Sequence, residues 1–394
     1  MTNLASSFVV SLDAPATQAQ TVTPSCSGAT VSPATLTIPV GQKSVSFTVN
    51  PPSAGSYTVD FSISSGLKRV GTPHPLSVTS GATYLARQAA LLAPGQCIRL
   101  DTGLTNDMVT LDGSDFLQWG ISMYRDPVRR EIGYIGKRDG PNVFHWAVYS
   151  EASNTWSNSR PLWSTDIVSG HGYDHNTCDP ATGDVYHVPF GSNVVRRWNG
   201  TWSTLPGWSQ NTTATGGLTW FPGLGLFYND GFGLLHWNGS TWTTRFALGN
   251  GSYHDFSEYN DSADVLIFGG GNGSGYYKMT RGLAVTPIAA PPGFAIGANP
   301  NSQGIAVSDP NSATLIARSS PTDVWAAYNI NAGSWSVLAQ SPGSGPPRGR
   351  PPRAPDTNNA PLCCAIEDMG VMMFVQHRGG AGSTPAEVWL YRHS

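Results

Sequence analysis

Two similar stretches decide the fold: Arg197-Trp198-Asn199-Gly200-Thr201-Trp202-Ser203-Thr204 and His236-Trp237-Asn238-Gly239-Ser240-Thr241-Trp242-Thr243. In each, an apolar strand runs into an Asn-Gly pair, and the chain returns in a strand that opens on tryptophan. Asn-Gly readily adopts positive φ at both positions, so it is the strongest short-range signal for a tight β-hairpin. The copies lie 39 residues apart. Self-similarity at that period predicts a propeller or a solenoid.

Weaker copies of this hairpin extend the repeat along the chain. Each copy is preceded by another hairpin, so every unit reads as four antiparallel strands. Six such units predict an all-β chain with a six-bladed β-propeller. The weaker copies span 144–156, 275–279, 324–335 and 388–392, and the preceding hairpins span 122–135, 173–188, 218–228, 254–270, 305–317 and 363–375.

The sixth unit lacks its outer strand, because the sequence ends at Ser394 directly after the third strand. An open sheet edge exposes unpaired backbone groups, which proteins avoid. The segment Gln96–Leu100, ahead of the first unit, is well placed to supply the missing strand. We therefore predict that it pairs with residues 386–392 and closes the ring.

Residues 96–394 resemble the kelch and galactose-oxidase-like propellers. The resemblance rests on Ile267-Phe268-Gly269-Gly270, an apolar run followed by a glycine pair, and on tryptophans that open the outer strands, Trp156, Trp202, Trp242 and Trp335. It implies an architecture, with these tryptophans packed between blades, far better than it implies an activity. No residue set matches the copper site of galactose oxidase, and no common hydrolase, metalloprotease or nucleotide-binding motif is present. The expectation is therefore no metal and no cofactor.

Residues 1–80 follow a different pattern. Val45, Phe47 and Val49 alternate with polar residues, as do the apolar positions of 57–63, and this predicts a small β-sandwich. The runs 31–42 and 54–59 resemble the Ig-like modules appended to bacteriophage and bacterial surface proteins, which implies a spacer or docking role. Residues 81–95, which include a helix-compatible stretch from Tyr84 to Leu92, form the expected connector to the propeller at 96–394.

Composition excludes several functions. Charged residues make up 12% of the chain, against about 25% in average soluble proteins. The net charge of −3 gives no basis for binding nucleic acid. No apolar run is long enough to span a membrane, and the first six residues lack the features of a secretory signal peptide. The five cysteines are too few and too scattered for a disulfide framework, so we expect them to be reduced and mostly buried.

The first strand of the second unit carries His171, Tyr173 and His175, which alternation places on one face. Two histidines on one face suggest a metal site. No nearby cysteine or carboxylate set completes it, so hydrogen bonding in a wet central channel is the favoured interpretation.

The equivalent strand two units later carries Tyr253, His254, Asp255 and Glu258. Histidine and carboxylates suggest acid–base chemistry, but alternation separates Asp255 from His254 and Glu258. Trp220 lies off the tryptophan repeat and suits stacking on a sugar ring. The candidate binding residues are therefore His171, Tyr173, His175, Trp220, Tyr253, His254 and Glu258.

These features favour a non-enzymatic bacteriophage virion protein, made in the host cytoplasm and present in many copies on the particle. The Ig-like module would dock onto other virion proteins of the head or tail, and the propeller would bind a host-surface glycan or protein. The alternative is a carbohydrate-active lyase or hydrolase with His171, His175, His254 and Glu258 around the channel mouth. A third hypothesis is a structural scaffold that binds neighbouring subunits.

Overall fold

The computed structural model describes residues 6–12, 14–51, 55–64, 74–78, 83–104, 120–136, 145–158, 160–162, 172, 174–209, 216–248, 254–271, 275–297, 304–319, 324–338, 362–377 and 386–394. The chain divides into two compact units: unit 1 comprises residues 1–91 with 151–154, and unit 2 comprises 92–150 and 155–394. Both are built from β-strands, as predicted. No helix in the described ranges is long and apolar enough to cross a membrane.

Unit 1 holds two antiparallel sheets that share one apolar core. The sheet orders are β1-β5-β3 and β4-β2-β6-β7. The predicted alternation supplies this core: Phe47, Val49 and Val59 are buried, and Val45 and Phe61 pack against them. The strands are β1 (Ser6–Ser11), β2 (Gln20–Cys26), β3 (Thr30–Ser32), β4 (Leu36–Ile38), β5 (Ser44–Asn50), β6 (Gly55–Ile63) and β7 (His74–Val78).

Helix α1 (Tyr84–Ala90) confirms the helix expected in this region. It begins after Thr83, whose side-chain hydroxyl accepts a hydrogen bond from the amide of Ala86. A threonine at this position satisfies one of the amides that the first turn leaves unpaired. The helix ends before Leu91, the last residue of the N-terminal part of unit 1.

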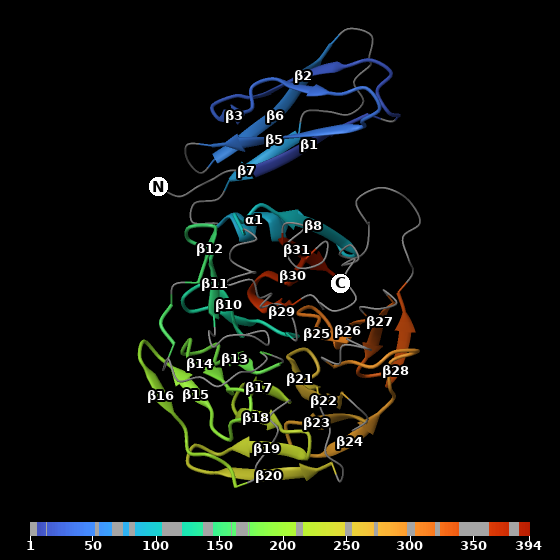
Figure 1. Ribbon diagram of the computed structural model, residues 1–394. Helices are drawn as coiled ribbons and strands as arrows, with labels where there is room; N and C mark the ends of the chain where they lie inside the picture. The colour runs from blue at the N-terminus through green and yellow to red at the C-terminus, as the bar shows by residue number, and fades with distance from the viewer. Residues whose placement is uncertain are drawn as a thin grey trace. The chain divides into compact units, whose positions relative to one another are not determined.

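Unit 2 contains, in its described residues, six four-stranded antiparallel sheets that follow one another around a common centre (Figure 1). The first strand of each sheet contacts the first strand of the next sheet, and the first strand of the sixth sheet contacts the first strand of the first sheet. This cyclic arrangement is that of a β-propeller. Sheet 1 consists of β9 (Tyr124–Asp126), β10 (Glu131–Gly136), β11 (His145–Ser150) and β12 (Thr155–Ser157), and sheet 2 of β13 (Asn176–Cys178), β14 (Val185–His187), β15 (Arg196–Trp198) and β16 (Trp202–Thr204). Sheet 3 consists of β17 (Gly217–Phe221), β18 (Gly225–Asn229), β19 (Gly233–Trp237) and β20 (Trp242–Ala247), and sheet 4 of β21 (Asp255–Asn260), β22 (Val265–Gly270), β23 (Tyr276–Thr280) and β24 (Val285–Ile288). Sheet 5 consists of β25 (Gly304–Ser308), β26 (Thr314–Ser319), β27 (Trp325–Asn329) and β28 (Ser334–Val337), and sheet 6 of β29 (Leu362–Ile366), β30 (Val371–His377), β31 (Ala386–Arg392) and β8 (Gln96–Leu100).

The predicted closure of the ring is confirmed. Strand β8 lies antiparallel to β31, with Leu100 opposite Val388 and Gln96 opposite Arg392. Sheet 6 is therefore completed by a strand that precedes sheet 1 in the chain. An ion pair of 3.3 Å between Arg99 and Glu387 joins the same two strands.

The repeated tryptophans join neighbouring sheets, as their fixed position in each unit predicts. Each opens or nearly opens the fourth strand of its sheet, and its indole N–H donates to an oxygen just beyond the fourth strand of the preceding sheet. A buried indole ordinarily finds such a partner. The four hydrogen bonds run from Trp156 to Thr102 Oγ1 (3.0 Å), from Trp202 to the Pro161 carbonyl (2.8 Å), from Trp242 to the Pro206 carbonyl (2.9 Å) and from Trp335 to the Ala289 carbonyl (2.8 Å).

The Asn-Gly hairpins form, but their turns differ from the expected tight geometry. Gly200 and Gly239 have positive φ angles of 106° and 96°, whereas the asparagines before them do not. The paired tryptophans Trp237 and Trp242 flank a loop of four residues. In this loop the Asn238 side chain accepts hydrogen bonds from two following amides, of 3.0 and 2.9 Å. Asparagine side chains compete with the backbone in this way, so here the side chain shapes the turn.

Candidate functional site

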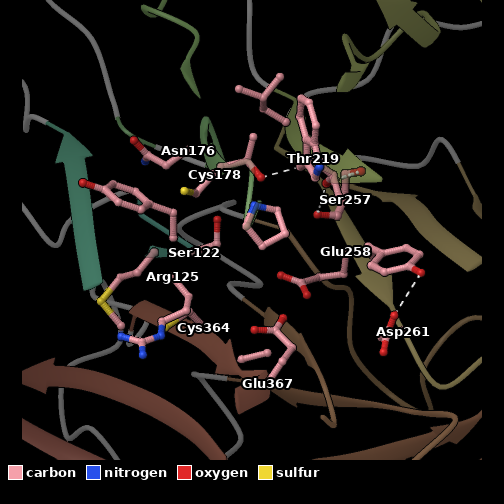
Figure 2. A pocket seen from close by; sticks show the side chains of 18 of the residues that line it. Ser122, Arg125, Asn176, Cys178, Thr219, Ser257, Glu258, Asp261, Cys364 and Glu367 are labelled. Carbon is pink, nitrogen blue, oxygen red and sulfur yellow. Dashed lines mark hydrogen bonds between the residues drawn. The ribbon is translucent and has the colours of Figure 1, made fainter. Parts of the chain in front are cut away.

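A cavity of about 330 Å³ lies inside unit 2, where the first strands of the sheets end. This is the lower end of the range of about 300–1,000 Å³ that holds small ligands. Its lining includes the buried residues Ser122, Asp174 and Ser257, which are 3%, 2% and 3% exposed. Exposed residues from the turns that follow the first strands, including Asp261 and Glu367, surround its opening. Figure 2 shows side chains from several sheets pointing into this one space.

Three buried residues of the lining are joined by hydrogen bonds, and we call them the cavity floor: Ser122, Asp174 and Ser257. The hydroxyl of Ser122 donates to Asp174 Oδ1, and the amide of Ser257 donates to Asp174 Oδ2 at 2.6 Å. Ser122 precedes sheet 1, Asp174 precedes sheet 2 and Ser257 belongs to sheet 4. One carboxyl group therefore connects three sheets.

Three carboxyl groups of the cavity lining have pKa values above their ordinary range. Burial of its carboxyl group raises the pKa of Glu367 from 4.5 to about 7. Burial raises the pKa of Asp174 from 3.8 to about 7, although its two hydrogen bonds oppose the change. Burial, followed by repulsion from Asp174, raises the pKa of Glu258 well above its ordinary value. Glu258 Oε2 accepts one weak hydrogen bond of 3.3 Å from the Ser308 amide. Near neutral pH these groups hold protons that an exposed carboxyl would have released.

The guanidinium of Arg125 lies in the cavity wall with its charge already balanced. Its Nε and Nη2 donate to the two carboxylate oxygens of Asp368, at 3.3 and 2.9 Å. This two-point geometry is the strong form of a carboxylate pair. The thiols of Cys178 and Cys364 also line the wall, and burial raises the pKa of both, so they remain neutral. All five cysteines of the chain carry free thiols.

An aromatic surface borders the cavity on the side of sheets 2 and 3. The Trp220 ring stacks on Tyr186 with centroids 5.6 Å apart and planes 13° apart. The Trp220 amide is held by the Thr177 hydroxyl at 3.0 Å. Tyr124 and Tyr259 line other parts of the wall. Flat rings beside polar groups are typical of sites that bind sugars.

The structure brings together two of the seven predicted site residues. Trp220 and Glu258 line the cavity, but His175 and His254 do not. His175 is fully buried, with its ring 6.3 Å from that of His187 and 6.2 Å from that of Tyr228. His175 points into the packing between sheets, so neither histidine belongs to the lining of this cavity, and their role in ligand binding stays a prediction. His171, Tyr173 and Tyr253 lie outside the described residues.

The sequence analysis missed the cavity floor. Ser122 and Asp174 lie beside residues that were singled out, but neither belongs to a recognisable motif. The available signal was their common position at the first strands of their units, which in a propeller all face one channel. Within the described residues, no group of three or more His, Cys, Asp or Glu side chains is placed to hold a metal ion.

We expect Asp174→Asn to change how the stability of unit 2 depends on pH. The pKa of Asp174 is higher in the folded protein than in the unfolded chain, so the folded protein binds the proton more tightly between pH 3.8 and about 7. The free energy of unfolding therefore falls as the pH rises through that window. Asparagine keeps both hydrogen bonds, since its oxygen accepts from Ser257 and its amide donates to Ser122. The variant should be more stable than the parent by on the order of 3 kcal/mol at about pH 8 and nearly equal to it at about pH 4.

Urea unfolding followed by tryptophan fluorescence measures this difference, because all 13 tryptophans lie in unit 2. Asp261→Asn, at the exposed opening, is the control and should shift stability by no more than about 0.5 kcal/mol at either pH. If the free energies of unfolding of the parent and of Asp174→Asn differed by the same amount at both pH values, the raised pKa of Asp174 would be contradicted.

Comparisons with known proteins leave the family open. No protein-family model and no curated protein matches the sequence. Among solved structures, virginiamycin B lyase from Staphylococcus aureus is similar with a TM-score of 0.46 and 13% identity, over 75% of this chain and 88% of that one. A protein of unknown function from Bacteroides thetaiotaomicron has a TM-score of 0.46 and 10% identity, over 94% of this chain and 90% of that one. A xyloglucanase from Xanthomonas campestris has a TM-score of 0.45 and 12% identity, over 75% of this chain and 45% of that one. Similarity at this level says nothing about activity or ligand, and the kelch and Ig-like resemblances stay predictions.

Proposed function

We propose that this chain is a non-enzymatic carbohydrate-binding protein whose cavity in unit 2 holds one sugar unit of a surface glycan. The observation that carries the proposal is the cavity itself, with a stacked Trp220–Tyr186 pair beside hydroxyl and carboxyl groups. Sugar rings present apolar faces to aromatic rings and hydroxyl groups to polar side chains. Both kinds of partner border the same 330 Å³ space.

The proposal includes a six-bladed propeller and an Ig-like module. Six four-stranded sheets with a closed cycle of first strands support the blade number. Two sheets that share a core support the sandwich.

Binding to a glycan array, followed by calorimetry on the glycan that binds, tests this function. We expect Trp220→Ala to weaken binding by about two- to tenfold, because a stacked aromatic contact contributes about 0.5–1.5 kcal/mol. Phe232→Ala removes an exposed aromatic ring in the turn between β18 and β19, which is not part of the cavity wall, and it should leave the affinity unchanged. The absence of binding to any glycan on the array at millimolar concentration would refute the function.

The biological setting that we propose is a bacteriophage particle, with unit 1 docked onto other virion proteins and unit 2 displayed towards the host. The two-unit organisation and the low content of charged residues support it. Many copies on one particle would let weak individual sites act together. The test is mass spectrometry of purified particles. Deletion of residues 1–80 should remove the protein from them, and its retention would refute the docking role of this segment.

A specific observation favours a second function, a glycoside hydrolase or polysaccharide lyase. Glu258 and Glu367 point their carboxyl groups into the same part of the cavity (Figure 2). The raised pKa of Glu258 is what a general acid requires near neutral pH. New reducing ends or unsaturated sugars after incubation with host polysaccharide, lost in Glu258→Gln, would establish catalysis in place of simple binding.

A further inference from the structure

The acidic groups of the cavity exceed its basic groups, and this imbalance constrains the ligand. Five carboxyl-bearing residues line the described cavity, and Arg125 is the lining residue that carries a positive side chain. Arg125 is already held at two points by Asp368. The five are Asp174, Glu258, Asp261, Glu367 and Asp368.

The excess of acidic groups matters most at the buried carboxyl group of the cavity floor. Asp174 is 2% exposed, and its hydrogen-bond partners are a hydroxyl and a backbone amide, both uncharged. Glu258 Oε2 accepts a long hydrogen bond of 3.3 Å from the Ser308 amide. A carboxylate withdrawn from water is stabilised by a proton or by a cation. Among the described residues, neither group has a cationic side chain as its hydrogen-bond partner, so we expect the proton or the ligand to supply the positive charge.

The aromatic wall is compatible with the same kind of ligand. Trp220 borders the cavity together with Glu258, and Tyr186 fixes its ring from behind. An aromatic face attracts a cation as well as the apolar face of a sugar ring. A ligand that combines a sugar ring with an ammonium group would therefore use both the wall and the floor.

Building on the carbohydrate-binding function, we propose that the sugar unit held in the cavity is an amino sugar with a free amine. Its ammonium group lies between Asp174 and Glu258, and its ring lies against Trp220. Sugars that carry carboxylates should bind poorly, because their negative charge would lie among five carboxyl-bearing residues whose ionisation it opposes, with one arginine in the lining. The N-acetylated form of the same sugar loses the charge and binds as a neutral ligand.

Such binding has a signature that a neutral sugar lacks. A cation placed beside Asp174 and Glu258 favours their charged forms, so the protein releases protons when it binds. Burial also raises the pKa of Glu367, to about 7, so the proton release that belongs to Asp174 and Glu258 is the part that is lost in their Asn and Gln variants. Proton release is measured by repeating calorimetry in buffers with different heats of ionisation.

The test is calorimetry of the full chain at about pH 7 with four tetrasaccharide probes, built from glucosamine, N-acetylglucosamine, glucose and galacturonate. We expect the glucosamine probe to bind about tenfold more tightly than the N-acetylated probe and to release protons, and the galacturonate probe not to bind. Asp174→Asn and Glu258→Gln should each reduce the preference for the glucosamine probe over the N-acetylated probe to about twofold. Each variant should also lose the part of the proton release that comes from the replaced carboxyl group. Two variants are used so that a folding defect in one does not decide the result, and Phe232→Ala is the control.

The outcomes separate this inference from the function on which it rests. Equal affinity for the glucosamine and N-acetylglucosamine probes, without proton release, overturns the amino-sugar assignment and leaves carbohydrate binding in place. If no tetrasaccharide binds here and no glycan binds on the array, both proposals fail. Proton release on binding a lysine-rich peptide, without binding of glucosamine, overturns the sugar assignment in favour of a protein ligand.

Discussion

A chain that starts at residue 102 should melt at least about 10 °C below a chain that starts at residue 92. The two differ by strand β8, which completes sheet 6 by pairing with β31 along five residues. Without it, β31 becomes an exposed edge, and the buried side chain of Leu100 and the ion pair of Arg99 with Glu387 are lost. Loss of one buried leucine alone costs about 2–5 kcal/mol, and the missing backbone pairing adds to it.

Both chains lack the N-terminal part of unit 1, so its removal does not contribute to the difference. Thermal unfolding is followed by tryptophan fluorescence, which reports on unit 2. Because the first strands form a closed cycle, opening one sheet should weaken the whole unit in a single transition. Equal melting temperatures would show that β8 does not hold the ring together.

The second large effect is expected from Gly217→Ala, which should destabilise unit 2 by about 3 kcal/mol or more. Gly217 opens β17, and a methyl group there would lie 2.3 Å from the Ser257 amide nitrogen and 2.6 Å from the Phe256 carbonyl carbon. Both atoms belong to the backbone of β21, so the first strands of sheets 3 and 4 would have to separate. The separation would also displace the amide that Ser257 donates to Asp174.

Gly282→Ala is the matched control, since its nearest atom is the Thr280 hydroxyl oxygen at 3.8 Å. Urea unfolding should show a change below about 0.5 kcal/mol for this variant. Loss of affinity for the ligand of the cavity should accompany the loss of stability in Gly217→Ala. A stable Gly217→Ala protein would mean that the first strands are less closely packed than described.

Local patterns in the sequence were sufficient for the strands and the closure. Asn-Gly hairpins at a fixed period, with tryptophan after each, identify repeating four-stranded units, and alternation in 45–49 identifies a face of the unit 1 core. The segment 96–100 was identified as the closing strand because one unit lacked a partner. Such features depend on neighbours in the sequence, so a sequence displays them directly.

Only the tertiary structure determined the cavity. Ser122 and Asp174 are 52 residues apart, and Ser257 is 83 residues beyond Asp174, yet one carboxyl group joins them. Each lies in, or just before, the first strand of a different sheet, and the closed cycle of first strands brings them together. The acidity of Asp174 depends on burial by these distant strands, which no local pattern encodes. For the same reason His175, one residue from Asp174, faces the packing between sheets, although the sequence made it the more prominent candidate.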